Sequence, residues 1–79
     1  MNTAIYIRKR VFRVSQVGMA ELLGVSQAAI SRQETTGFIP TDRQRVIRDL
    51  ARERGLEWSD SWFFEVPPDV EHEIDEAAA

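Results

Sequence analysis

Four side chains near the middle of the chain have the residue types and the spacing to contact the edges of nucleic-acid bases. They are Gln27, Ala28, Ser31 and Arg32. Positions i, i+1, i+4 and i+5 share one face of an α-helix, so these side chains could act together. Glutamine can make a bidentate hydrogen bond to adenine, arginine can make one to guanine, and alanine can touch the methyl group of thymine. Alternatively, Gln27 is a solvated helix residue, and Arg32 pairs with Glu21 or Glu34.

Two short predicted helices, joined by a tight turn, would present that face. Apolar spacing predicts one helix over residues 16–23 and a second over residues 27–34. Gly24 would take the positive φ that the turn needs, Ser26 would cap the second helix, and Ile30 would anchor it to the core. Helices joined so closely must cross steeply. The second helix would then project from the body of the domain, where a DNA major groove could receive it.

This pattern resembles the helix-turn-helix of the Cro and lambda-type phage repressors, the XRE-like superfamily. The resemblance covers about residues 3–64 and is most specific over residues 15–34. The matching residues are Ser15-Gln16, Ala20, Leu23-Gly24-Val25-Ser26-Gln27, Ile30-Ser31-Arg32 and Glu34. The resemblance implies an all-α, five-helix, lambda-repressor-like DNA-binding domain over residues 1–66, with its helix-turn-helix at about residues 16–34. A flexible acidic tail would follow over residues 67–79.

The resemblance also implies a function. A Cro-like dimeric repressor would insert its second motif helix into the major groove of a near-palindromic operator in double-stranded DNA. The outward side chains described above would then contact the bases. The alternative is an antitoxin-like protein-interaction module, which would neutralise a partner through its C-terminal segment and bind DNA only to regulate its own synthesis.

A second set of residues is expected to contact the DNA backbone: Gln16, Ser26, Arg43 and Arg45. In related repressors a glutamine at the place of Gln16 bonds a phosphate, aided by the amides at the helix N-terminus. Arg43 and Arg45 stand at the start of a later predicted helix, near the loop that flanks the backbone in relatives. For both arginines, an ordinary solvated helix face is the alternative.

One ion pair is expected to set the angle of the second motif helix. Arg10 and Glu34 match a pair that often forms a salt bridge in these repressors. The link between the first and second predicted helices is about one residue shorter than in some relatives, so Arg8 or Lys9 could replace Arg10. Gln33 departs from the pattern, since relatives usually place tryptophan or leucine there. A polar residue at that position would weaken or rotate the end of the helix.

Three further helices complete the expected domain. One covers residues 3–12, and a short one covers residues 59–64. Between them, a helix begins at a capping box formed by Thr41 and Gln44 and ends before Gly55. Its apolar residues at helical spacing are Val46, Ile47, Leu50 and Ala51.

Large apolar side chains are concentrated near the end of the domain, at Trp58, Trp62, Phe63, Phe64 and Val66. Some of them must complete the core, and Trp62 is the strongest candidate for that. The surplus predicts a dimer interface, because small domains tend to cover their apolar patches. Phage-type repressors pair through this region, so the resemblance implies a homodimer. The interface residues would be Trp58, Phe63, Phe64 and Val66, with a short strand around Val66 as an alternative form of pairing.

Charge is distributed unevenly along the 79 residues, whose net charge is −3. Residues 1–54 contain ten basic and five acidic side chains, whereas residues 55–79 contain eight acidic side chains and no lysine or arginine. This asymmetry suggests a basic body and an acidic end. Binding to phosphates depends on the charge at the contact face rather than on the total, so the acidic balance does not exclude a DNA partner.

Composition argues against several other classes of protein. The chain has no cysteine, and its one histidine, His72, lies in the acidic tail, so no metal site is expected. The sequence shows no group of residues that could act together as nucleophile, base and phosphate-binding loop. We therefore expect that the protein is not an enzyme and binds no cofactor or small-molecule ligand. No stretch approaches the ~20 apolar residues of a membrane span, and no signal peptide is evident. A cytoplasmic protein, associated with the nucleoid when bound to DNA, is the simplest interpretation.

Overall fold

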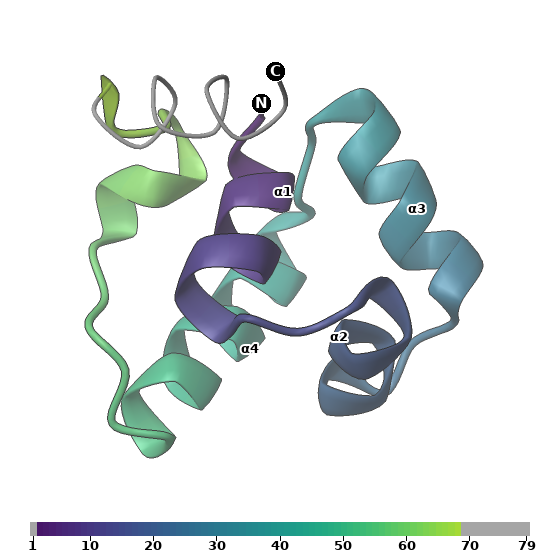
Figure 1. Cartoon of the computed structure of the whole chain (residues 1–79), viewed down its shortest axis with the longest axis horizontal. Coiled ribbons are helices and arrows are strands. Elements are labelled where there is room, and N and C mark those ends of the chain that lie inside the picture. The colour runs from purple at the N-terminus through teal and green to yellow at the C-terminus, as the bar shows by residue number, and fades with distance from the viewer. Residues whose placement is uncertain (1, 69–79) are drawn as a thin grey trace.

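Helices and their connecting turns account for the whole fold that the computed structural model describes, which covers residues 2–68 and contains no strand (Figure 1). The elements are α1 (Thr3–Tyr6), the π-helix η1 (Ile7–Phe12), α2 (Gln16–Leu23), α3 (Gln27–Thr36), α4 (Thr41–Glu53) and the 3-10 turn η2 (Asp60–Phe63). Figure 1 shows α1 and η1 in the middle of the molecule, with α3 on one side and η2 on the other.

Short polar side chains start the first three α-helices. Asn2 caps α1, Ser15 caps α2 and Ser26 caps α3. Each side-chain oxygen accepts a hydrogen bond from the backbone N–H three residues later, over 3.0 Å for Asn2 and Ser15 and 3.1 Å for Ser26. These bonds satisfy helix N–H groups that otherwise have no partner. The predicted cap at Ser26 and the predicted bounds of α2 are thereby confirmed.

The first expected helix is only partly α-helical. Residues 3–6 form α1, but residues 7–12 widen into a π-helix that ends at Arg13, whose φ is +57°. A π-helix bonds residue i+5 to residue i, so it turns its side chains to a different register from an α-helix. Arg8 and Phe12 consequently both face inward and are buried. This change of register decides which arginine can reach α3.

The core takes one large side chain from each of four elements. Ile7 of η1, Met19 of α2, Ile30 of α3 and Ile47 of α4 are its largest fully buried side chains. The predicted anchoring role of Ile30 is therefore confirmed. Because these four elements contribute to one cluster, the orientation of α3 depends on the rest of the domain.

The start of α4 differs from the expected capping box. Pro40 is the N-cap and Thr41 is the first helical residue, so the hydroxyl of Thr41 does not cap the helix. Gln44 uses its side-chain amide to donate a 2.9 Å hydrogen bond to the carbonyl oxygen of Ile39. The end of α4 agrees with the prediction, because Gly55 follows it with a φ of +70°.

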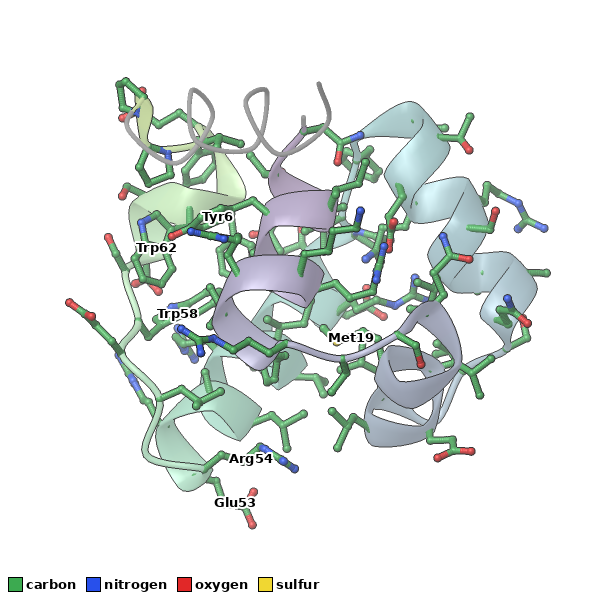
Figure 2. The ribbon with its side chains drawn as sticks, viewed as in Figure 1. Tyr6, Met19, Glu53, Arg54, Trp58 and Trp62 are labelled. Atoms are coloured by element: carbon green, nitrogen blue, oxygen red, sulfur yellow. The ribbon has the colours of Figure 1, made fainter. Side chains whose placement is uncertain are left out.

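Aromatic rings attach the C-terminal segment to α1. Tyr6 and Trp62 meet edge to face with their centroids 5.5 Å apart, and Trp58 meets Trp62 in the same way at 5.5 Å. Figure 2 shows Tyr6, Trp62 and Trp58 on the side of the molecule away from α3. The expected fifth helix over residues 59–64 is instead the short 3-10 turn η2. Most of the expected flexible tail, residues 69–79, lies outside the described residues.

Because Tyr6 is buried, we expect the protein to lose stability at high pH. Burial raises the pKa of its hydroxyl above the ordinary value of 10.0, Arg10 opposes this increase, and Glu57 adds to it. The folded-state pKa therefore exceeds the unfolded one, so the contribution of Tyr6 is intact below about pH 10 and is lost as the pH rises through the folded pKa. We expect Tm to fall more steeply above about pH 10 in the wild type than in Tyr6→Phe. Identical pH profiles would contradict this expectation.

Candidate functional site

The turn between α2 and α3 has the geometry that the sequence predicts. Only three residues separate the two helices, and Gly24 ends α2 with a φ of +68°. The N–H of Val25 then donates a 3.0 Å hydrogen bond to the carbonyl oxygen of Ala20. This closed turn directs the chain away from α2, and α3 runs along the edge of the molecule (Figure 1). The helix ends at Thr36, two residues beyond the predicted end at Glu34.

The outer face of α3 carries the four predicted base-contacting residues, Gln27, Ala28, Ser31 and Arg32, all of which are exposed. Within the described part of the chain, none of their side chains makes a hydrogen bond or an ion pair. In particular, Arg32 is not paired with Glu21 or Glu34, which was the alternative for this residue. The polar groups of this face are therefore available to a ligand.

The ion pair that holds α3 is formed by Arg8 and not by Arg10. Arg8 Nε donates to Glu34 Oε2 over 2.6 Å, and Arg8 Nη2 donates to Glu34 Oε1 over 2.9 Å. Both residues are buried, and the third donor, Arg8 Nη1, bonds the carbonyl oxygen of Val14 at 3.1 Å. Arg10 is exposed and lines a separate hollow with Tyr6. The π-helical register of η1 explains why Arg8, the alternative candidate, occupies this place.

Glu34 also joins two other elements to α3. The side-chain amide of Gln16, at the start of α2, donates to Glu34 Oε1 over 3.3 Å. Asn2, ahead of α1, donates its side-chain amide to the backbone carbonyl oxygen of Glu34. Gln16 thus has a structural partner, and its contact with a phosphate stays a prediction. Ser26 likewise has a structural role as the cap of α3, and its phosphate contact is equally untested.

A partly buried polar contact, which could not be predicted from the sequence, joins α3 to α4. Gln33 is only 6% exposed, and its Oε1 accepts a 3.0 Å hydrogen bond from Arg43 Nη1. The amide therefore does not weaken the end of α3, which continues to Thr36. The one sequence signal was the departure at Gln33 itself, where a polar residue replaces the usual apolar one. Its partner, ten residues later, could not be identified without knowing how the two helices cross.

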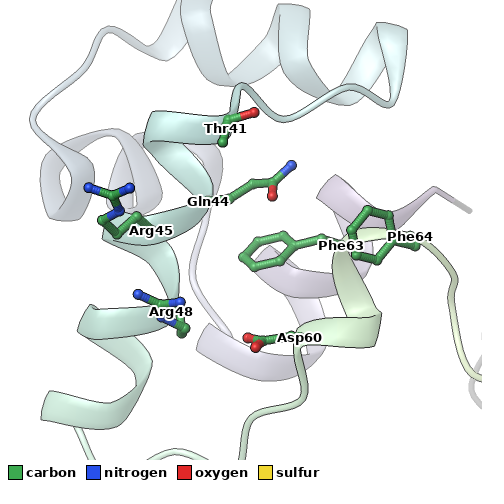
Figure 3. A pocket seen from close by; sticks show the side chains of 7 residues that line it. All are labelled: Thr41, Gln44, Arg45, Arg48, Asp60, Phe63 and Phe64. Atoms are coloured by element: carbon green, nitrogen blue, oxygen red, sulfur yellow. The ribbon is translucent and has the colours of Figure 1, made fainter.

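The two arginines predicted to bind phosphate lie on different faces of α4. Arg43 is turned towards α3 and is half-buried. Arg45 is exposed and, together with Arg48, lines a hollow between α4 and η2 (Figure 3). Side chains two positions apart point to nearly opposite sides of a helix. Arg43, but not Arg45, is thus next to the outer face of α3.

The residues proposed for a dimer interface have unequal exposure. Trp58 is half-buried, contacts Trp62 and Phe63, and donates its Nε1–H to Asp60 Oδ1 over 2.9 Å. Phe63 and Val66 are also half-buried. Phe64 is 79% exposed, and Figure 3 shows it next to Phe63 among the side chains that line the hollow. Of the four, Phe64 offers the most apolar surface to a second molecule.

Within residues 2–68, no three acidic or histidine side chains gather into a group that could hold a metal ion. No helix in the same range is long and apolar enough to cross a membrane. Comparisons with known protein families, with curated proteins and with solved structures found no match to this chain.

Proposed function

We propose that this chain is a sequence-specific regulator of transcription that binds double-stranded DNA and resembles the Cro-like repressors, with α3 entering the major groove. The observation that supports this most is the state of the outer face of α3. Gln27 and Arg32 are exposed and have no partner in the described structure, although the helix that carries them is fixed by Ile30 and Glu34. A rigid helix with unpaired donors and acceptors on one face suits contacts with base edges.

The proposal includes a two-fold dimer on a near-palindromic operator. Two copies would place their α3 helices in successive major grooves, about 34 Å apart along the DNA. The exposed Phe64 would contribute to the contact between the copies. Binding would weaken with salt, because each phosphate that the protein neutralises releases counterions.

Selection from random duplex DNA at two salt concentrations is the direct test. We expect enrichment of a symmetric site, from which operator affinity can then be measured. Gln27→Ala and Arg32→Ala should each weaken operator binding by ~1–3 kcal/mol and relax the preference at one base position. Arg54→Ala is the charge-matched control, because Arg54 is exposed at the end of α4 distant from α3 (Figure 2).

Two results would argue against the proposal. Failure to enrich any sequence over bulk genomic fragments would exclude sequence-specific binding. If Arg32→Ala weakened binding no more than Arg54→Ala, α3 would not be the contacting helix. An equal loss on all sequences would instead assign Arg32 to a phosphate.

A further inference from the structure

Gln33 is an unusual residue to bury between two helices. Its side chain is 6% exposed, and its contact with Arg43 is the one side-chain hydrogen bond that it makes within the described structure. Burying an amide is unfavourable unless it is hydrogen-bonded, and an apolar residue would avoid that cost. Within the described residues, the hydrogen bond to Arg43 is therefore the contact that offsets the cost of burying this amide.

The contact fixes Arg43 without neutralising it. A glutamine oxygen is a neutral acceptor, so the guanidinium retains its full positive charge. Nη1 is engaged by Gln33, whereas the remaining N–H groups of Arg43 have no partner in residues 2–68. Arginine has several donors in a fixed plane, so the free ones can still bind an oxyanion in a bidentate manner.

A second arginine lies beside the first. Arg32 and Arg43 both line an open hollow of about 310 Å³, together with Thr36 and Phe38. No acidic side chain lines this hollow. Two positive charges that line one hollow without a carboxylate make its electrostatic potential positive, and a bound anion would be attracted there. The hollow borders the outer face of α3, where a bound duplex would bring its backbone close.

We infer that Gln33 is a positioning residue, which holds Arg43 so that Arg43 binds one backbone phosphate of duplex DNA next to the base that Arg32 contacts. This inference rests on the proposed function and adds to it the residue that orients Arg43 for the expected backbone contact. Thr36 also lines the hollow, but its hydroxyl proton is shared between the carbonyl oxygens of Arg32 and Gln33. The phosphate contact therefore does not include Thr36 as a donor. The exposed Phe38 forms an apolar wall of the hollow, against which a deoxyribose could pack.

The test uses the full chain and a random-sequence duplex of about 30 base pairs, titrated at several KCl concentrations. Arg43→Gln should reduce the slope of log Kobs against log[KCl] by about 0.9, the value for one phosphate contact. Gln33→Leu should weaken binding by about two- to tenfold, the range for one lost hydrogen bond. The double variant should bind no more weakly than Arg43→Gln alone, because Gln33 acts only through Arg43.

Gln33→Glu separates the positioning role from a purely structural one. It retains the size and the acceptor of glutamine but pairs a negative charge with Arg43. We expect Tm to be unchanged or higher while DNA affinity and the salt slope both fall. Gln44→Leu is the matched control, because this amide belongs to α4, donates to the backbone carbonyl oxygen of Ile39, and lines the hollow next to η2 rather than the one that holds Arg32 and Arg43. It should leave the salt slope unchanged.

The possible outcomes distinguish the two proposals. If the wild type shows no salt-dependent binding to duplex DNA, the proposed function is wrong. If the wild type binds and the effects of Gln33→Leu and Arg43→Gln are additive, the inference is wrong and the function stands. Wild-type affinity in Gln33→Glu would also overturn the inference. If Gln33→Leu does not fold, Gln33→Glu and Arg43→Gln still test the positioning role of Gln33.

Discussion

Replacing Glu34 with alanine should lower the free energy of unfolding by about 3–5 kcal/mol. The change leaves the guanidinium of Arg8, a buried residue, without the carboxylate that balances its charge. Rehydrating that charge would require the packing of η1 against α3 to open. A domain of this size has a total stability of roughly 5 kcal/mol, so much of the variant should be unfolded. Urea denaturation at neutral pH, followed by circular dichroism, measures the effect.

An exposed ion pair in the same chain provides the control. Arg48 Nε and Asp49 Oδ1 lie 3.4 Å apart, and their side chains are 34% and 61% exposed. Asp49→Ala should therefore change the stability by no more than ~1 kcal/mol. Replacing both members of the buried pair, as Arg8→Met with Glu34→Leu, should recover part of the loss, because no unpaired charge remains. A double variant less stable than Glu34→Ala would contradict this account.

Ile47→Ala should lower the free energy of unfolding by about 2–5 kcal/mol. Ile47 is completely buried at the centre of the domain, so truncation removes its contacts and leaves a cavity among side chains from other elements. The adjacent residue provides an unusually close comparison. Val46 belongs to the same helix and to the same apolar pattern in the sequence, yet it is 48% exposed.

Val46→Ala is accordingly expected to change the stability by less than about 1 kcal/mol. Thermal and urea denaturation of the two variants under the same conditions would test both values. Similar losses for the two would mean that Val46 is covered, for instance by a second molecule. Repeating the measurement at several protein concentrations would identify such a contact, because the stability of a dimer depends on concentration.

Local features of this fold could be predicted from the sequence. Ser15 and Ser26 cap helices through bonds to residues three positions away, and Gly24 relieves a local steric conflict. Such effects depend on neighbours in the chain, so the residue types are sufficient to predict them. Ile30 could also be assigned to the core, because helical spacing separates it from the polar face.

Features that depend on how helices cross could not be predicted. Glu34 was expected to pair first with Arg10, but in the structure it pairs with Arg8. The reason is that η1 is a π-helix, and apolar spacing in the sequence does not distinguish a π-helix from an α-helix. The contact between Gln33 and Arg43 joins two helices through side chains that give no joint signal in the sequence. The capping box was wrong for a different reason, since α4 begins one residue earlier than its pattern suggests.

The three hydrogen-bond partners of Glu34 affect the entropy change that would accompany ligand binding to α3. Asn2, Arg8 and Gln16 reach this single residue from three separate segments, so α3 cannot swing outward unless all three contacts break together. A helix held in this way fluctuates mainly when the whole domain unfolds. It is preorganised, and little conformational freedom remains to be lost when a ligand docks on its outer side. In the proposed complex with DNA, this rigidity would therefore increase the affinity.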